Sequence, residues 1–103
     1  MTPLPRNYDW LVTKFKKFMQ NHQELGKTLR EAGPIKEKDA NLIQLGAAAA
    51  IKAEGAVHSH VRRALAAGAT PEEIYHAIIL LTSTIGFPAV AAALSWAREI
   101  VEK

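Results

Sequence analysis

The chain has 103 residues, of which 49% are hydrophobic and 22% are charged, and its formal net charge at pH 7 is +3. This length allows one small domain with a buried core, and the composition argues against disorder. The absence of cysteine excludes disulfides, thiolate nucleophiles and cysteine metal ligands. The positive charges are scattered and do not form a basic face with stacking aromatic residues, so we expect no nucleic-acid partner.

Hydrophobic residues at helical spacing predict a first helix over residues 8–31. The stripe consists of Leu11, Phe15, Phe18, Met19, Leu25 and Leu29. Glycine at 33 suits the end of a helix, and Pro34 cannot continue one. The spacing is typical of a stripe that faces a protein core.

An alanine-rich second helix is predicted to begin near Lys36 and to be interrupted at Glu54–Gly55, because glycine weakens a helix interior. A third helix follows over residues 56–67 and ends at Gly68. Thr70, Pro71 and Glu73 then form the pattern of a capping box with proline in the first turn, which predicts a fourth helix. The last helix is predicted to begin near Pro88.

These elements predict an all-α, single-domain bundle of about five helices that spans residues 1–103. Residues 43–51 and 77–94 are apolar on more than one side, so we expect a homo-oligomer in which a second copy covers part of this surface. The apolar run from residue 77 is broken at Gly86 and Pro88, which favours two buried helices over a membrane span. No signal peptide is visible, and we expect a cytoplasmic protein without membrane contact.

Two histidines, His58 and His60, lie two residues apart on the predicted third helix. Such residues point about 200° apart on a regular helix, so they cannot line one site together. Glu54 and His58 have the i, i+4 spacing of helical metal ligands, but Gly55 lies between them and no third ligand is evident. We therefore expect no metal, and we interpret His58 as a solvated helix residue.

His60 is in phase with Val57, Ala64 and Ala67, on the side of the helix that is predicted to face inward. It is either a half-buried structural histidine bonded to a backbone carbonyl, or a general acid or base that titrates near neutral pH. In the second case Glu54 would orient the ring or act as a second proton-transfer group. The other two histidines carry no distinguishing context.

The segment "HVRRALAAGATPEEI" (60–74), followed by "IGFPAVAAAL" (85–94), resembles the carboxymuconolactone decarboxylase and alkylhydroperoxidase D-like family. The matching positions are His60, Ala64, Gly68, Thr70, Glu72, Glu73, Ile74, Gly86, Pro88 and Ala89. The likeness covers roughly residues 10–102. It implies an all-helical, alkylhydroperoxidase D-like fold and homo-oligomers, often trimers or hexamers, with active sites near the subunit boundaries.

The peroxidase branch of this family carries a Cys-x-x-Cys motif that ends four residues before the histidine. Ala53 and Ala56 occupy these positions here, so disulfide-based peroxide reduction is excluded by the usual route. A peroxiredoxin activity label would be inherited from the family. The decarboxylase branch lacks the thiols and tends to place acidic residues before the histidine, as Glu54 stands six residues before His60.

The resemblance thus implies a cofactor-free decarboxylation of a small carboxylated lactone. His60 would supply or relay the proton, with Glu54 beside it. His58 and Arg62 (or Arg63) are candidates for holding the substrate, and the small molecule would be the partner besides further copies of the chain. The alternatives are a different small-molecule activity at His60 and a non-catalytic helical assembly.

Overall fold

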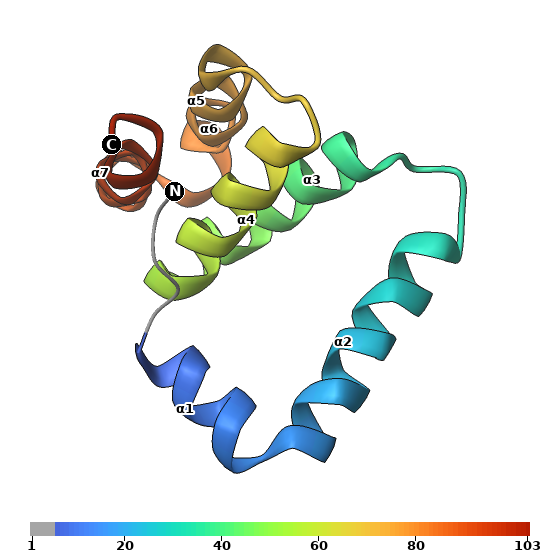
Figure 1. Cartoon of the computed structure of the whole chain (residues 1–103). Coiled ribbons are helices and arrows are strands. Elements are labelled where there is room, and N and C mark those ends of the chain that lie inside the picture. Colours follow the sequence, from blue (N-terminus) through green and yellow to red (C-terminus); the bar gives the residue numbers. More distant parts are fainter. Residues whose placement is uncertain (1–5) are drawn as a thin grey trace. The chain divides into compact units, whose positions relative to one another are not determined.

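The computed structural model describes residues 6–103, and every regular element in this range is a helix (Figure 1). The predicted all-α class is confirmed. The contacts group the chain into two compact units, with the division between Ile35 and Lys36. The two units are described separately.

The first unit contains α1 (Arg6–Lys14) and α2 (Lys16–Glu31), where the sequence predicted one continuous helix. The break is at Phe15, whose φ of −126° and ψ of 62° lie outside the helical region. Its ring meets that of Trp10 edge to face with the centroids 5.6 Å apart, a favourable aromatic geometry. The turn at Phe15 thus brings this residue of the predicted stripe against Trp10.

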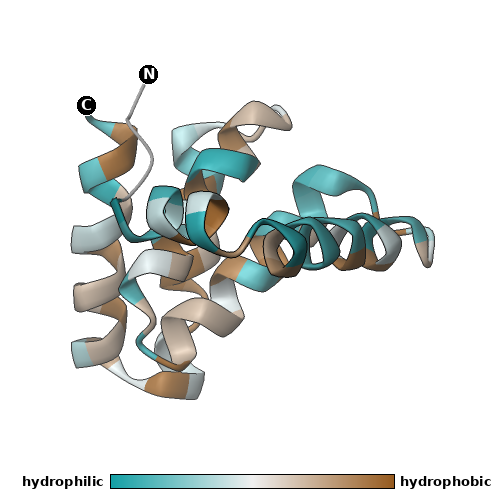
Figure 2. Ribbon diagram, turned by 60° about the horizontal axis from the view of Figure 1, so that its bottom comes forward, coloured by the Kyte–Doolittle hydropathy of each residue, from teal (hydrophilic) through white to brown (hydrophobic). Residues whose placement is uncertain are grey.

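The hydrophobic stripe of the first unit is largely exposed. Met19 is buried, with 5% of its surface accessible, whereas Phe18 is 61% and Leu29 is 59% exposed. Hydrophobic residues recur along these helices among many hydrophilic ones, as the brown and teal segments in Figure 2 show. The periodicity predicted the helical conformation correctly, but the stripe that was expected to face a core is largely exposed.

The second unit contains the remaining five helices. They are α3 (Glu37–Ala50), α4 (Glu54–Ala66), α5 (Pro71–Ile79), the short α6 (Thr82–Ile85) and α7 (Phe87–Val101). Both α4 and α5 contact α3 and α7, so the four longer helices share one core. This core includes Leu45, Val57, Val61, Ala64, Ile74, Ile78, Val90, Ala93 and Ala97.

The turn between α3 and α4 differs from the prediction. The interruption falls at Ile51–Ala53, and Lys52 adopts a left-handed backbone conformation with φ of 58°. Gly55 lies in the first turn of α4, where the backbone N–H groups lack helical partners in any case. Glu54 is therefore the first residue of α4, one turn before His58.

The predicted start of α5 is confirmed. The Glu73 backbone N–H donates to Thr70 Oγ1 over 3.1 Å, and the Thr70 N–H donates to Glu73 Oε1 over 2.9 Å. Pro71 occupies the first turn. The hydrogen bond from the Thr70 backbone and the ammonium of Lys38, 3.1 Å from Glu73 Oε2, lower the pKa of the Glu73 carboxyl. Glu73 of the capping box therefore both stabilises the start of α5 and forms an ion pair with Lys38 of α3.

No helix among residues 6–103 combines the length and apolar character that crossing a bilayer requires.

Replacing Thr70 by alanine should lower the free energy of unfolding by about 1 kcal/mol, because the Glu73 N–H loses its acceptor. Urea unfolding followed by circular dichroism measures this change. Thr84→Ala is the matched control, since Thr84 is exposed within α6. Equal stability of the two variants would contradict the role of the capping box.

Candidate functional site

The side chain of His60 is half-buried on α4 and meets a buried amide of α3. Its Nδ1 lies 3.2 Å from Oδ1 of Asn41, of which 1% is exposed. Within the described residues, Asn41 is the buried polar residue of the core. A buried amide requires hydrogen-bond partners, so the contact fixes the histidine ring as well as satisfying Asn41.

The orientation of the Asn41 amide determines which nitrogen of His60 carries the proton. Asn41 Nδ2 donates to the backbone carbonyl of Glu37 over 3.0 Å, which leaves Oδ1 facing the ring. An amide oxygen only accepts, so Nδ1 of His60 must be the donor. The neutral ring then has its free lone pair on Nε2, and this nitrogen gains and loses the titrating proton.

The surroundings of His60 favour the neutral imidazole. Burial lowers the pKa of His60 below its usual value, and the positive charge of Arg63 lowers it further. Asn41 contributes no compensating negative charge, in contrast to a carboxylate at the same place. The site therefore holds a neutral ring of fixed tautomer, the form that accepts a proton at Nε2.

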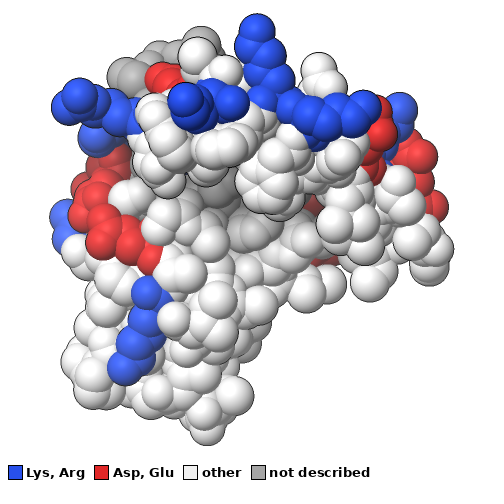
Figure 3. Space-filling model, turned by 90° about the horizontal axis from the view of Figure 1, so that it is seen from below, with Lys and Arg blue, Asp and Glu red and all other residues white. Residues whose placement is uncertain are grey.

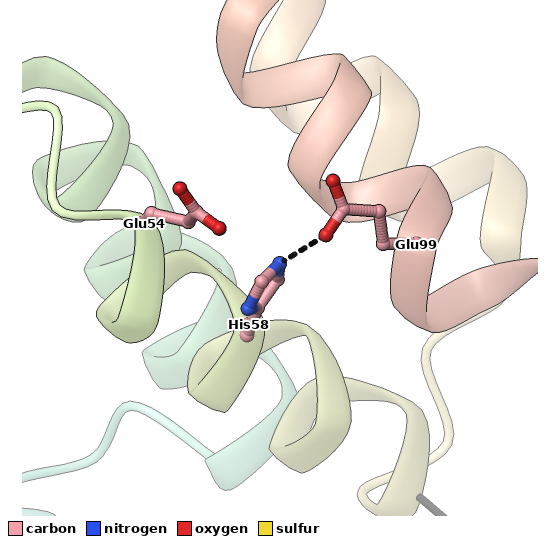
Figure 4. A group of neighbouring side chains, drawn as sticks. All are labelled: Glu54, His58 and Glu99. Carbon is pink, nitrogen blue, oxygen red and sulfur yellow. Dashed lines mark hydrogen bonds and ion pairs between the residues drawn. The ribbon is translucent and has the colours of Figure 1, made fainter. Parts of the chain in front are cut away.

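Glu54, the other predicted catalytic residue, lies beside His58. Nε2 of His58 is 3.1 Å from Oε2 of Glu99, and the Glu54 carboxylate completes a group whose ligand atoms lie within 4.8 Å of one another. Figure 4 shows Glu54 and His58 extending from α4 toward Glu99 on α7. His58 therefore contacts the Glu99 carboxylate and lies near that of Glu54. The sequence analysis had interpreted His58 as a solvated residue and did not predict this.

The structure therefore brings Glu54 to His58, and it gives His60 a different partner. Arg62 is half-buried on α4. It is Arg63, one turn after His60, whose charge acts on the His60 ring. The pairing of Glu54 with His60, expected from the sequence, is replaced by the pairing of Asn41 with His60.

Sequence reasoning missed Asn41 and Glu99. Asn41 stands in phase with Leu45, Ala48 and Ala49 on the buried face of α3. An amide in such a stripe was the available signal. Glu99 lies 41 residues from His58 and has no local feature that marks it.

A separate pocket of about 390 Å³ lies between α3 and α5. Its lining consists of Leu42, Ile43, Gly46, Glu73, His76, Ala77, Leu80 and Leu81. The lining is mostly apolar, with His76 and Glu73 as its ionisable groups. The sequence around His76 has no feature that marks it as functional, and the structure places this residue at the pocket.

Nuclear magnetic resonance titration of the His60 ring should give a pKa below the ordinary value of histidine. Asn41→Asp should raise this pKa, because a carboxylate next to Nδ1–H stabilises the charged ring. Asn41→Leu should leave the ring more disordered, because the acceptor is lost. Identical titration curves for the wild type and Asn41→Asp would contradict the contact.

One family model matches the chain, that of the carboxymuconolactone decarboxylase family, over residues 15–99. A search among curated proteins finds no match. A search among solved structures also finds none. The family match covers most of the chain, including both histidines and all helices of the second unit except the end of α7. Together with the all-helical architecture, it shows that the chain belongs to the carboxymuconolactone decarboxylase family.

Proposed function

We propose that the protein catalyses the cofactor-free decarboxylation of a small carboxylated, unsaturated lactone, with His60 as the proton-transfer group. The observation that carries this proposal is the half-buried ring of His60, held by Asn41 with its titrating nitrogen at Nε2. Membership of the family supports the reaction class. We propose the cytoplasm as its setting, as the sequence predicted.

In the proposed reaction, the bond between a ring carbon and its carboxylate carbon breaks and CO2 leaves. The electron pair of this bond is delocalised through the neighbouring double bond into the lactone carbonyl, as a dienolate. A proton from Nε2 of the cationic His60 ring then adds to a ring carbon and gives the neutral lactone. Solvent returns the proton to Nε2, so the protein is unchanged over the cycle.

Arg63 is a candidate for binding the substrate carboxylate. Its positive charge already acts on His60, so a substrate carboxylate near the ring would be attracted by the same field. Arg62, its half-buried neighbour, is a second candidate for this contact. Asn41 acts as a positioning residue, because it holds the ring through Nδ1 in both protonation states.

The pocket between α3 and α5 favours a second candidate function. Its apolar lining suits a small apolar molecule, and His76 gives it an ionisable group. A small-molecule activity at this pocket is therefore a second candidate, beside the two alternatives predicted from the sequence, which are a different activity at His60 and a non-catalytic assembly. Thiol peroxidase chemistry would need cysteines, which the sequence lacks.

Incubation with 4-carboxymuconolactone should release CO2 and remove the lactone absorbance. His60→Gln should lower kcat at least about 100-fold, because general acid–base groups contribute roughly 10²–10⁴-fold. His22→Gln is the control, since His22 is an exposed histidine of α2. A folded wild-type protein without turnover would reject this substrate. Equal rates in the two variants would reject His60 as the proton-transfer group.

The pH dependence follows from the lowered pKa of His60. The cationic donor form accumulates only below this pKa, so kcat/KM should fall as the pH rises through it. Steady-state rates measured from above the ordinary histidine pKa to well below it test this profile. In Asn41→Asp the fall should shift to higher pH. A profile that does not move would exclude His60 as the titrating donor.

We also propose that the chain works as a homo-oligomer, a trimer or hexamer. Large hydrophobic residues of the second unit are exposed, among them Ile43 at 59%, Leu80 at 62% and Phe87 at 69%. On the face drawn in Figure 3, wide areas between the charged groups carry neither Lys or Arg nor Asp or Glu. Exposed hydrophobic side chains such as Ile43, Leu80 and Phe87 are typical of subunit interfaces.

Leu80→Glu should shift the protein toward the monomer in analytical ultracentrifugation, because it would place a charge in the proposed interface. Gln20→Glu is the matched control, since Gln20 is an exposed polar residue of α2. A monomeric wild type at micromolar concentration would contradict the proposed assembly.

A further inference from the structure

Glu54, His58 and Glu99 form a group that the proposed reaction does not use. Two of them lie one turn apart on α4, and the third lies on α7, which packs against α4 (Figure 4). We propose that these three side chains bind a divalent transition-metal ion, with Zn²⁺ as the representative of the class.

The geometry of the group is close to that of a three-residue metal site. Its imidazole nitrogen and two carboxylate oxygens lie within 4.8 Å of one another, and the closest pair, His58 Nε2 and Glu99 Oε2, is 3.1 Å apart. Zn²⁺ binds nitrogen and oxygen ligands at about 2.0–2.2 Å, which places tetrahedral ligands roughly 3.3–3.6 Å apart. The His58–Glu99 pair already has nearly this separation, and a rotation of the exposed Glu54 side chain completes the set.

The charges of the group also favour a cation. Two carboxylates converge on one imidazole, and the nitrogen that faces Glu99 can donate a single hydrogen bond. The ion pair of His58 with Glu99 therefore gives the Glu54 carboxylate no donor. A divalent ion would neutralise both carboxylates and use the lone pair of Nε2 at the same time.

The ligand types select the class of ion. Imidazole suits Zn²⁺ and its transition-metal neighbours, whereas Mg²⁺ and Ca²⁺ prefer oxygen ligands. The i, i+4 spacing of Glu54 and His58 is the helical spacing of paired ligands. The side chain of His58 is 19% exposed, so the ring is held against the protein while the site stays open to solvent for a bound water. Three protein ligands and one water make a four-coordinate site.

The test is calorimetric titration of the untagged, chelator-treated full chain with Zn²⁺, and separately with Mg²⁺. The wild type should bind one Zn²⁺ per chain and should show no comparable response to Mg²⁺. His58→Gln and Glu99→Gln should each weaken Zn²⁺ binding more than about tenfold, because each removes a ligand. His22→Gln and Glu24→Gln, which change exposed residues of α2, should bind as the wild type does.

Circular dichroism shows whether each variant is folded. Glu54→Gln is the second variant if His58→Gln does not fold, because the Glu54 side chain is exposed at the start of α4. It should likewise weaken Zn²⁺ binding and abolish the rise in melting temperature that Zn²⁺ gives the wild type. No saturable binding by the wild type, full binding by folded His58→Gln, or equal binding of Mg²⁺ would each overturn the proposal. The group would then be an ion pair between α4 and α7 only.

Discussion

The packing of α4 against both α3 and α7 is the constraint on which the chemistry of this protein depends. Val57, Val61 and Ala64 are completely buried along one side of α4. This buried side fixes the rotation of the helix about its axis. Because residues two positions apart point about 200° apart, His58 and His60 must then face different neighbours. His60 meets Asn41 of α3, and His58 meets Glu99 of α7.

The two histidines consequently differ in chemistry although they are nearly adjacent in sequence. The neutral amide of Asn41 accepts a hydrogen bond from His60, and burial disfavours the charged form of the histidine ring. The carboxylates of Glu54 and Glu99 lie beside the His58 ring, a setting that suits a bound metal cation. The first environment suits reversible proton transfer at Nε2, and the second suits a bound positive charge. The proposed reaction and the proposed metal site therefore do not compete for the same ring.

Features that depend on neighbouring residues were predicted well from the sequence. The start of α5 is specified by Thr70, Pro71 and Glu73, which interact with one another within a single turn. The helical class follows from the periodicity in the same way. The break at Phe15 was not predicted, because the hydrophobic spacing continues across it without a glycine or a proline. Periodicity also cannot tell what covers a stripe, as the exposed Phe18 shows.

The site was predicted only in part, for a related reason. The inward phase of His60 was correctly inferred from Val57 and Ala64, and the structure shows the ring half-buried. Its partner lies 19 residues earlier on another helix, and Glu99 lies 41 residues after His58. Such pairings arise only when helices pack. The proximity of Glu54 to His58 also depends on where α4 begins. The left-handed Lys52 precedes a helix start at Glu54, whereas the sequence analysis placed this start at Ala56.

The two histidines of α4 have partners on different helices, and this affects which substitutions can alter each of them. The partner of one histidine belongs to α3 and the partner of the other belongs to α7, while the backbone that carries both rings is shared. A single exchange on α7 can therefore alter one environment while the contact on α3 stays intact, and the reverse is equally true. The surroundings of His58 and those of His60 can therefore change independently in evolution, although the two residues are nearly adjacent in the sequence.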